Sequence, residues 1–77
     1  MKLRIAPAEG KTFEFEPQEE ETIIGRSSTA DLPLSDPFLS RQHARLLLTD
    51  DGLSIEDLGS RNGTFVNGVK LDGPMSL

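Results

Sequence analysis

Three short polar clusters contain the side chains of this sequence that could do chemistry. They are Gly25-Arg26-Ser27-Ser28, Ser40-Arg41-Gln42-His43 and Ser60-Arg61-Asn62. Their guanidinium, hydroxyl and amide groups can donate hydrogen bonds, and no carboxylate is among them. Such a set of donors favours an oxyanion, and arginine suits phosphate because its planar fork forms two parallel hydrogen bonds. The clusters therefore predict a phosphate-binding site, provided that the fold brings them together.

Each cluster also has a simpler interpretation when it is taken alone. Arg26 could be a solvated loop residue, Ser40 could cap a turn, and Asn62-Gly63 could be an ordinary turn. His43 is the only histidine, and a packed, hydrogen-bonded structural role is the preferred interpretation for it. Arg45 follows on the same strand and is expected to be a charge on the sheet surface. Only the joint pattern favours an anion site.

The composition of the chain limits the classes of function. Its 77 residues allow one domain at most, and the net charge of −5 argues against general binding to nucleic acid or to an anionic membrane. The absence of cysteine excludes a disulfide framework and a thiolate metal site, and neither a metal nor a cofactor is expected. No apolar run approaches the roughly 18 residues of a transmembrane helix, and the start lacks the apolar segment of a signal peptide. A cytoplasmic location is therefore expected.

Short β-like runs separated by turn signals are the elements that must position the clusters. These runs are residues 2–6, 11–15, 22–25, 31–34, 43–49, 53–58, 64–66 and 69–71. Pro33 restricts its run to an edge strand or a very short strand. Many short strands at this spacing are typical of an all-β fold, a β-sandwich of short, mostly antiparallel strands. The loops of a sandwich gather at its two ends, which could bring the clusters together.

Two Asn-Gly pairs lie five residues apart and are expected to serve different purposes. Asn67-Gly68 lies between two apolar runs and predicts a hairpin with a type I′ turn, which needs positive φ at both central residues. Asn62-Gly63 follows a polar run instead. Left-handed backbone there is expected to shape a loop and to leave the Asn62 side chain free to bond something outside.

The segments IIGRSSTADLPLSDPFLSRQHARLLL and LSIEDLGSRNGTFVNG resemble a forkhead-associated (FHA) domain. They match the Gly-Arg, Ser-Arg-x-His and Ser-x-Asn-Gly-Thr-x-Val-Asn-Gly motifs of that family, in order and at ordinary spacing. The resemblance runs from the first strand to about Leu71, and residues 1–77 are expected to be a single FHA domain. It implies an FHA/SMAD-like sandwich without enzymatic activity that binds phosphothreonine-containing proteins or peptides through an arginine cluster.

The resemblance also implies a role for each residue that would contact the ligand. Arg26 and Ser40 would contact the phosphate of a phosphothreonine. Arg41 would contact the phosphate or the peptide beside it. Arg61 occupies the position whose backbone N–H faces the phosphate, and its side chain could add charge. Asn62 would hold the peptide backbone next to the phosphothreonine.

Three further residues are implied to support the site structurally. Gly25 would allow a close approach of backbone, and His43 would tie the binding loops together. Gly63 would shape the loop that carries Asn62.

The end of the chain departs from the family pattern. The family continues after the last hairpin with strands built around a Gly-Asp step and an aromatic residue, whereas this chain continues as VKLDGPMSL. The C-terminal strands are therefore expected to be missing from the sandwich. An open C-terminal edge would then be available for strand pairing with another chain.

Two alternative interpretations belong to other classes of protein. Ser40 and His43 could form a hydrolytic pair, but no oxyanion hole is evident and no acid is obviously placed to orient the imidazole. Alternatively, the chain could be a phosphate-independent assembly module that binds its partner through a sheet face or edge.

Overall fold

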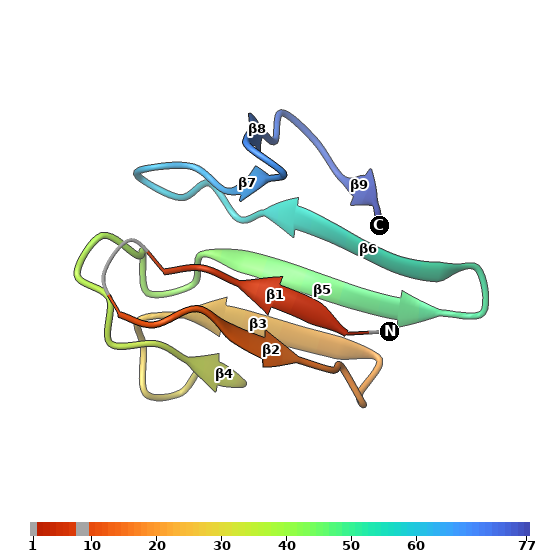
Figure 1. Cartoon of the computed structure of the whole chain (residues 1–77), viewed down its shortest axis with the longest axis horizontal. Coiled ribbons are helices and arrows are strands. Elements are labelled where there is room, and N and C mark those ends of the chain that lie inside the picture. The colour runs from red at the N-terminus through yellow and green to blue at the C-terminus, as the bar shows by residue number, and fades with distance from the viewer. Residues whose placement is uncertain (1, 8–9) are drawn as a thin grey trace.

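The computed structural model describes residues 2–7 and 10–77, and these residues form an all-β arrangement (Figure 1). Nine strands in this part of the chain make three sheets. The strands are β1 (Leu3–Ile5), β2 (Phe13–Phe15), β3 (Glu21–Gly25), β4 (Leu32–Pro33), β5 (Ala44–Thr49), β6 (Gly52–Asp57), β7 (Phe65–Val66), β8 (Val69–Lys70) and β9 (Met75–Ser76). Within the same residues, no helix is long and apolar enough to cross a membrane.

A five-stranded sheet in the order β4-β3-β5-β6-β9 is the largest element. Only β4 runs parallel to its neighbour, and the other pairs are antiparallel. Alternation along the strands directs Ile24, Leu46 and Leu53 to one face, where they form the buried core. Leu3 and Phe15, from the β1–β2 hairpin, pack partly buried against this core. The fold is therefore two-layered, as the sequence predicts for a sandwich.

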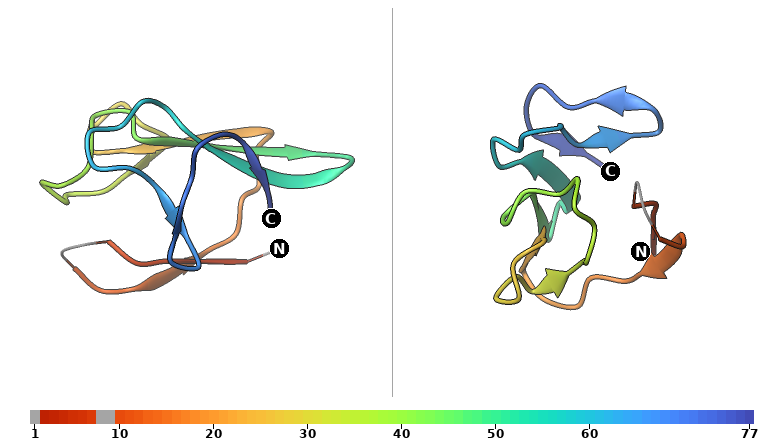
Figure 2. Two further views of the ribbon diagram at one scale, coloured as in Figure 1. Left: turned by 90° about the horizontal axis from the view of Figure 1, so that it is seen from above. Right: turned by 90° about the vertical axis from the view of Figure 1, so that its left-hand side faces the viewer.

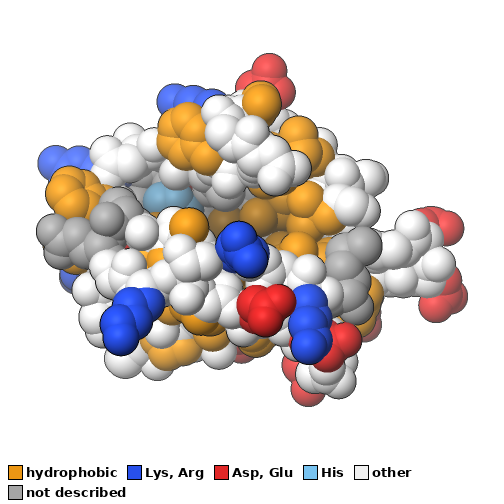
Figure 3. All heavy atoms as spheres, viewed as in Figure 1, with side chains coloured by type: hydrophobic (Ala, Val, Ile, Leu, Met, Phe, Trp, Pro, Cys, Tyr) orange, Lys and Arg blue, Asp and Glu red, His pale blue; other side chains and the backbone are white. Residues whose placement is uncertain are grey.

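The second layer is made of two separate hairpins. Figure 2 shows β1–β2 facing the five-stranded sheet, while the β7–β8 hairpin extends from the end of β6 towards the same side. Among the described strands, β1 pairs only with β2 and β7 pairs only with β8. A cleft of about 550 Å³ remains between these hairpins and the large sheet. Its apolar floor is visible as a hollow in the surface (Figure 3).

Each predicted run corresponds to an observed strand, and the ends of the two agree within about two residues. Asn67 and Gly68 have φ values of 52° and 83°, so the predicted type I′ turn is confirmed. In the other Asn-Gly pair only Gly63 has a positive φ, at 86°, so the prediction of left-handed backbone is wrong for Asn62. The prediction for residues 64–66 begins one residue early, since β7 starts at Phe65.

A further difference is β9, which was not predicted from the sequence. Met75 and Ser76 pair with Ile55 and Ser54, and β9 thereby becomes the edge of the large sheet. A strand of two residues is too short to show alternation, so its existence depends on the partner that β6 offers. The C-terminal edge that was expected to be open is thus covered in part by β9.

Candidate functional site

The three polar clusters lie at the same end of the five-stranded sheet. Ile24 of β3 pairs with Ala44 of β5, and Ala44 pairs in turn with Asp57 of β6. Because these neighbouring strands are antiparallel, β3 and β6 end where β5 begins. The loops that contain Arg26, Ser40 and Arg61 must therefore meet there.

Arg26 is fixed by its backbone and by one nitrogen of its side chain. Its backbone N–H donates to the carbonyl of Ser40 at 3.0 Å, and its Nε donates to the carbonyl of Leu39 at 3.1 Å. The residue is exposed, and no ion pair joins its guanidinium to any residue that the structure describes. The two terminal nitrogens are consequently held in position and remain available to an anion.

Ser40 joins the second loop to the third. Its Oγ accepts a hydrogen bond of 2.9 Å from the backbone N–H of Arg61. This N–H was expected to face a phosphate, but in the structure it bonds the hydroxyl instead. Since Oγ is the acceptor, the hydroxyl proton of Ser40 can still be donated to a ligand.

Asn62 and Arg41 are both exposed at this end of the sheet. The Nδ2 of Asn62 donates to the carbonyl of Phe38 at 2.7 Å, which leaves a second amide proton and the Oδ1 acceptor for a ligand. The backbone carbonyl of Arg41, and not its side chain, packs against Gly25. A Cβ at Gly25 would lie 1.9 Å from the Arg41 carbonyl oxygen, so only glycine allows β3 and this loop to pack together.

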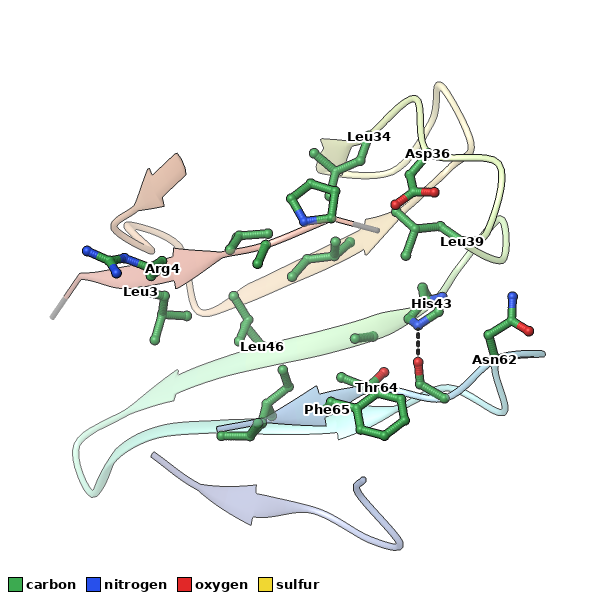
Figure 4. A pocket seen from close by; sticks show the side chains of 18 of the residues that line it. Leu3, Arg4, Leu34, Asp36, Leu39, His43, Leu46, Asn62, Thr64 and Phe65 are labelled. Atoms are coloured by element: carbon green, nitrogen blue, oxygen red, sulfur yellow. Dashed lines mark hydrogen bonds between the residues drawn. The ribbon is translucent and has the colours of Figure 1, made fainter. Parts of the chain in front are cut away.

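His43 is buried beneath the loops, with 5% of its surface exposed. Its Nδ1 accepts a hydrogen bond of 3.1 Å from the Ser40 backbone N–H, which can only donate. The proton is therefore on Nε2, which lies 2.8 Å from the carbonyl of Gly63 and donates to it (Figure 4). The imidazole ring thus bridges the loops that carry Ser40 and Gly63.

Asp57 holds the third loop and was not predicted from the sequence. Its Oδ2 accepts from the Ser60 N–H at 2.9 Å, and its Oδ1 accepts from the hydroxyls of Ser60 at 2.5 Å and Thr64 at 2.7 Å. Burial alone would raise the pKa of the Asp57 carboxyl, but the hydrogen bonds from Ser60 and Thr64 hold that pKa below its usual value. The available signal was weak: an aspartate at the end of a predicted strand can accept from backbone N–H groups of the loop that follows.

A second aspartate anchors the other side of the site. Asp36 has only 2% of its surface exposed, and its Oδ1 accepts from the Phe38 N–H at 2.9 Å. Its carbonyl accepts from the Leu39 N–H at 3.0 Å. Asp36 therefore fixes the loop whose carbonyls hold Arg26 and Asn62.

Arg45 is not part of this site. It lies on β5 opposite Glu56 of β6, and it forms ion pairs with both Glu56 and Glu21. The hydrogen bond with Glu56 raises the pKa of the Arg45 guanidinium. The expectation that Arg45 is a charge on the sheet surface is therefore confirmed. In the part of the chain that the structure describes, no three His, Asp or Glu side chains could hold a metal ion together.

Comparison with known proteins identifies the family. The family model of the FHA domain matches residues 22–77, which is most of the chain. The chain belongs to the FHA domain family. Among curated proteins, the FHA domain-containing protein FhaB of Mycobacterium tuberculosis is 40% identical over 53 residues, which are 69% of this chain and 34% of FhaB. The chain thus spans about a third of the length of that relative.

Solved structures of other FHA domains match nearly the whole chain. The FHA domain of the CT664 protein from Chlamydia trachomatis is 36% identical and has a TM-score of 0.75, over 99% of this chain and 77% of that one. An FHA domain from an analysis of phosphothreonine-dependent FHA domain interactions is 30% identical and has a TM-score of 0.76, over 99% and 76% of the two chains. The predicted family and the predicted all-β fold are both confirmed.

This FHA domain therefore positions its three motifs through contacts that the motifs make with one another. Backbone carbonyls of one loop hold Arg26, while Ser40 and His43 connect that loop to the loop that contains Arg61 and Gly63. Asp57 holds this second loop from the end of β6. The result is one rigid surface of donors rather than three independent loops.

Proposed function

We propose that this FHA domain is a protein interaction module that binds phosphothreonine-containing peptides at the surface formed by its three motifs. The observation that carries the proposal is the pairing state of the arginines. Arg26, Arg41 and Arg61 are exposed and have no ion-pair partner among the described residues, although the chain as a whole is acidic. Phosphothreonine carries about −1.5 to −2 charges near pH 7 and would supply the missing partner.

The phosphate is clamped by groups that are already in place. Arg26 contributes its two terminal nitrogens and Ser40 contributes its hydroxyl proton, while Arg41 and Arg61 add positive charge on either side. Each charge-assisted hydrogen bond contributes roughly 1.5–3 kcal/mol. Because the loops are fixed before binding, the entropic cost of ordering them reduces the free energy of binding only slightly. A few such bonds then give a dissociation constant near micromolar, which is a binding free energy of about −8 kcal/mol.

Asn62 holds the peptide backbone beside the phosphothreonine. Its amide has one donor and one acceptor left after the bond to Phe38, which is the pair that an extended peptide can satisfy. Gly25, His43 and Gly63 support this surface without contacting the ligand. The proposal for Gly63 agrees with its positive φ of 86°, which disfavours any residue with a side chain.

Enzymatic activity is not part of the proposal. The Nδ1 of His43 accepts from the backbone of Ser40 and its Nε2 donates to Gly63, so neither nitrogen can take the proton of the Ser40 hydroxyl. A general base must be able to accept that proton. The domain is expected to act in the cytoplasm, in signalling by phosphorylated partners, and to need neither nucleic acid nor a membrane.

A phosphate-independent assembly role is the second candidate, and the open cleft favours it. Among the strands that the structure describes, β1 and β7 each have a free edge, and the exposed Phe65 and Val69 lie on the β7–β8 hairpin. Free edges next to apolar side chains can recruit a strand from another chain. On this proposal residues 1–77 are a single FHA domain that takes up a strand from another chain at these edges.

The test uses the Arg26→Ala and Arg26→Lys variants with a phosphothreonine peptide and its unphosphorylated twin. Alanine should weaken phosphopeptide binding at least tenfold, about 1.4 kcal/mol, with little change in melting temperature. Lysine should restore only part of the loss, since it cannot form the fork. Arg4→Ala is the matched control, because Arg4 is exposed on β1 at the far end of the cleft from Asn62 (Figure 4).

Two results would contradict the proposal. Calorimetry that finds the wild-type affinity for Arg26→Ala would show that the phosphate is bound elsewhere. Equal binding of the partner before and after dephosphorylation would favour the assembly role instead.

A further inference from the structure

Both asparagines of the chain are followed by glycine, but the two Asn-Gly pairs differ in their surroundings. Asn62-Gly63 belongs to the binding surface, and Asn67-Gly68 forms the turn between β7 and β8. Asparagine is one of the thermolabile residues of proteins, because its side-chain amide reacts with the backbone nitrogen of the next residue. Glycine favours this reaction, since it has no side chain that would hinder the attack. The surroundings of each pair therefore decide which asparagine reacts.

The reaction, deamidation, is a cyclisation followed by hydrolysis. The backbone nitrogen of the glycine attacks Cγ of the asparagine side chain, and a new C–N bond closes a five-membered imide. The bond from Cγ to the side-chain nitrogen breaks, and that nitrogen leaves as ammonia with the proton of the glycine N–H. Water then opens the imide to aspartate or to isoaspartate. The reaction therefore needs a backbone N–H without a partner, a side chain that is able to turn towards it, and open space around the glycine.

At Asn62-Gly63 the fold blocks all three requirements. The N–H of Gly63 donates to the Oγ of Ser60 at 2.9 Å, so it already has a partner. The Nδ2 of Asn62 donates to the carbonyl of Phe38 at 2.7 Å, which holds the side chain away from the glycine nitrogen. The side chain of Lys70 covers Gly63, since a Cβ at Gly63 would lie 2.8 Å from the Lys70 Cε. Cyclisation at Asn62 would have to break two hydrogen bonds and displace Lys70.

At Asn67-Gly68 none of these obstacles is present. Both residues are exposed, and a Cβ at Gly68 would meet no atom within 4 Å. In the part of the chain that the structure describes, neither the Asn67 amide nor the Gly68 N–H has a hydrogen-bond partner. The side chain of Asn67 is therefore free to turn onto the nitrogen of Gly68.

We propose that Asn67 is a site of spontaneous deamidation and that the contacts of the binding surface protect Asn62 from the same reaction. The inference goes beyond the proposed function and does not depend on it. Each event replaces a neutral amide by a carboxylate, and the isoaspartate product adds one carbon to the main chain of the turn. Because β7 and β8 pair only with each other among the described strands, a distorted turn loosens their hairpin.

The experiment follows both asparagines in one peptide. The domain in its natural full-length protein is incubated at mildly alkaline pH, below its melting temperature, and is then digested with trypsin. Trypsin cleaves after Arg61 and Lys70, so the fragment 62–70 contains both sites, and tandem mass spectrometry assigns the added mass to one of them. In the folded protein Asn67 should be modified at least about tenfold faster than Asn62, since reaction at Asn62 must first break two hydrogen bonds. In urea the two should react at similar rates.

Asn67→Gly is the matched control, because glycine keeps the positive φ of 52° at this position and removes the reactive amide. The variant should gain no mass at residue 67 and should keep the slow wild-type rate at Asn62. The inference is overturned if the folded protein is modified at Asn62 as fast as at Asn67, or if Asn67 stays unmodified. It is also overturned if the preference for Asn67 persists in urea, since the local sequence and not the fold would then set the rates.

Discussion

Replacement of His43 by alanine tests whether one buried side chain couples the stability of the fold to ligand binding. The imidazole accepts from the Ser40 N–H and donates to the Gly63 carbonyl. Alanine removes both hydrogen bonds and leaves a space beneath the loops. We expect the variant to be less stable and to bind phosphopeptide more weakly, because both loops lose their common support.

The magnitude follows from the two backbone groups that lose a partner. A buried donor or acceptor without a partner costs about 1–3 kcal/mol. Ser40 and Gly63 are only half-buried, so water can reach them in part and a total of about 2–4 kcal/mol is expected. At about 0.05–0.15 kcal/mol per residue, the whole chain has a free energy of unfolding of only about 4–12 kcal/mol. The substitution therefore removes a large fraction of the stability.

Two further variants separate the bonds. In His43→Asn the side-chain oxygen can accept from Ser40, whereas in His43→Gln the longer amide can donate to Gly63. Each should recover part of the loss in urea denaturation, and calorimetry with a phosphothreonine peptide should follow the same order. Unchanged stability of His43→Ala together with lost binding would refute the reasoning, since His43 would then contact the ligand directly.

Three other changes test the support of the site and the cleft. Gly25→Ala should destabilise the fold by about 1–3 kcal/mol or more, measured in urea, because its Cβ would overlap the backbone of Arg41; the unchanged wild-type midpoint would contradict this. Asp57→Asn should cost about 1–2 kcal/mol at pH 7, allowing for partial exposure. The pKa of the Asp57 carboxyl is lowered on folding, so its contribution to stability is complete above about pH 4 and is lost as pH falls through the folded pKa; a stability difference between wild type and variant that does not shrink on acidification would exclude this origin. Residues 1–77 alone should aggregate or pair with another chain in size-exclusion chromatography, because the apolar cleft and the edges of β1 and β7 are open; a monomer that melts cooperatively would show that the fold needs no more.

Much of the fold could be predicted because its local signals agree with the final structure. Strands β5 and β6 correspond to clear apolar runs on either side of a turn, and the Asn67-Gly68 turn has the φ values that its residue types demand. Strand β9 could not be predicted, because a strand of two residues is too short to show an alternation of apolar and polar side chains. Tertiary pairing with β6 decides its conformation, and that information is not local.

The site was predictable to the extent that it consists of exposed donors at strand ends. The antiparallel order of β3, β5 and β6 then brings these donors together. The acceptors beneath them were not predicted. Clusters without carboxylates favour a phosphate site, whereas the Asp57 carboxylate lies three residues before Ser60 and accepts the hydrogen bonds that hold the loop.

The distribution of buried polar residues links these observations. Of the three polar or charged residues that are buried in the described part of the chain, Asp36 and His43 lie under the binding loops, and Thr22 lies on β3. Burial of polar groups is unfavourable unless each finds a hydrogen-bond partner, and at the loops those partners are backbone groups of the ligand surface. Any substitution that removes one of these backbone partners therefore also leaves a buried polar side chain without a hydrogen bond. Stability and phosphopeptide affinity should change together for the supporting residues and separately for Arg26, whose terminal nitrogens make no hydrogen bond or ion pair with the described residues.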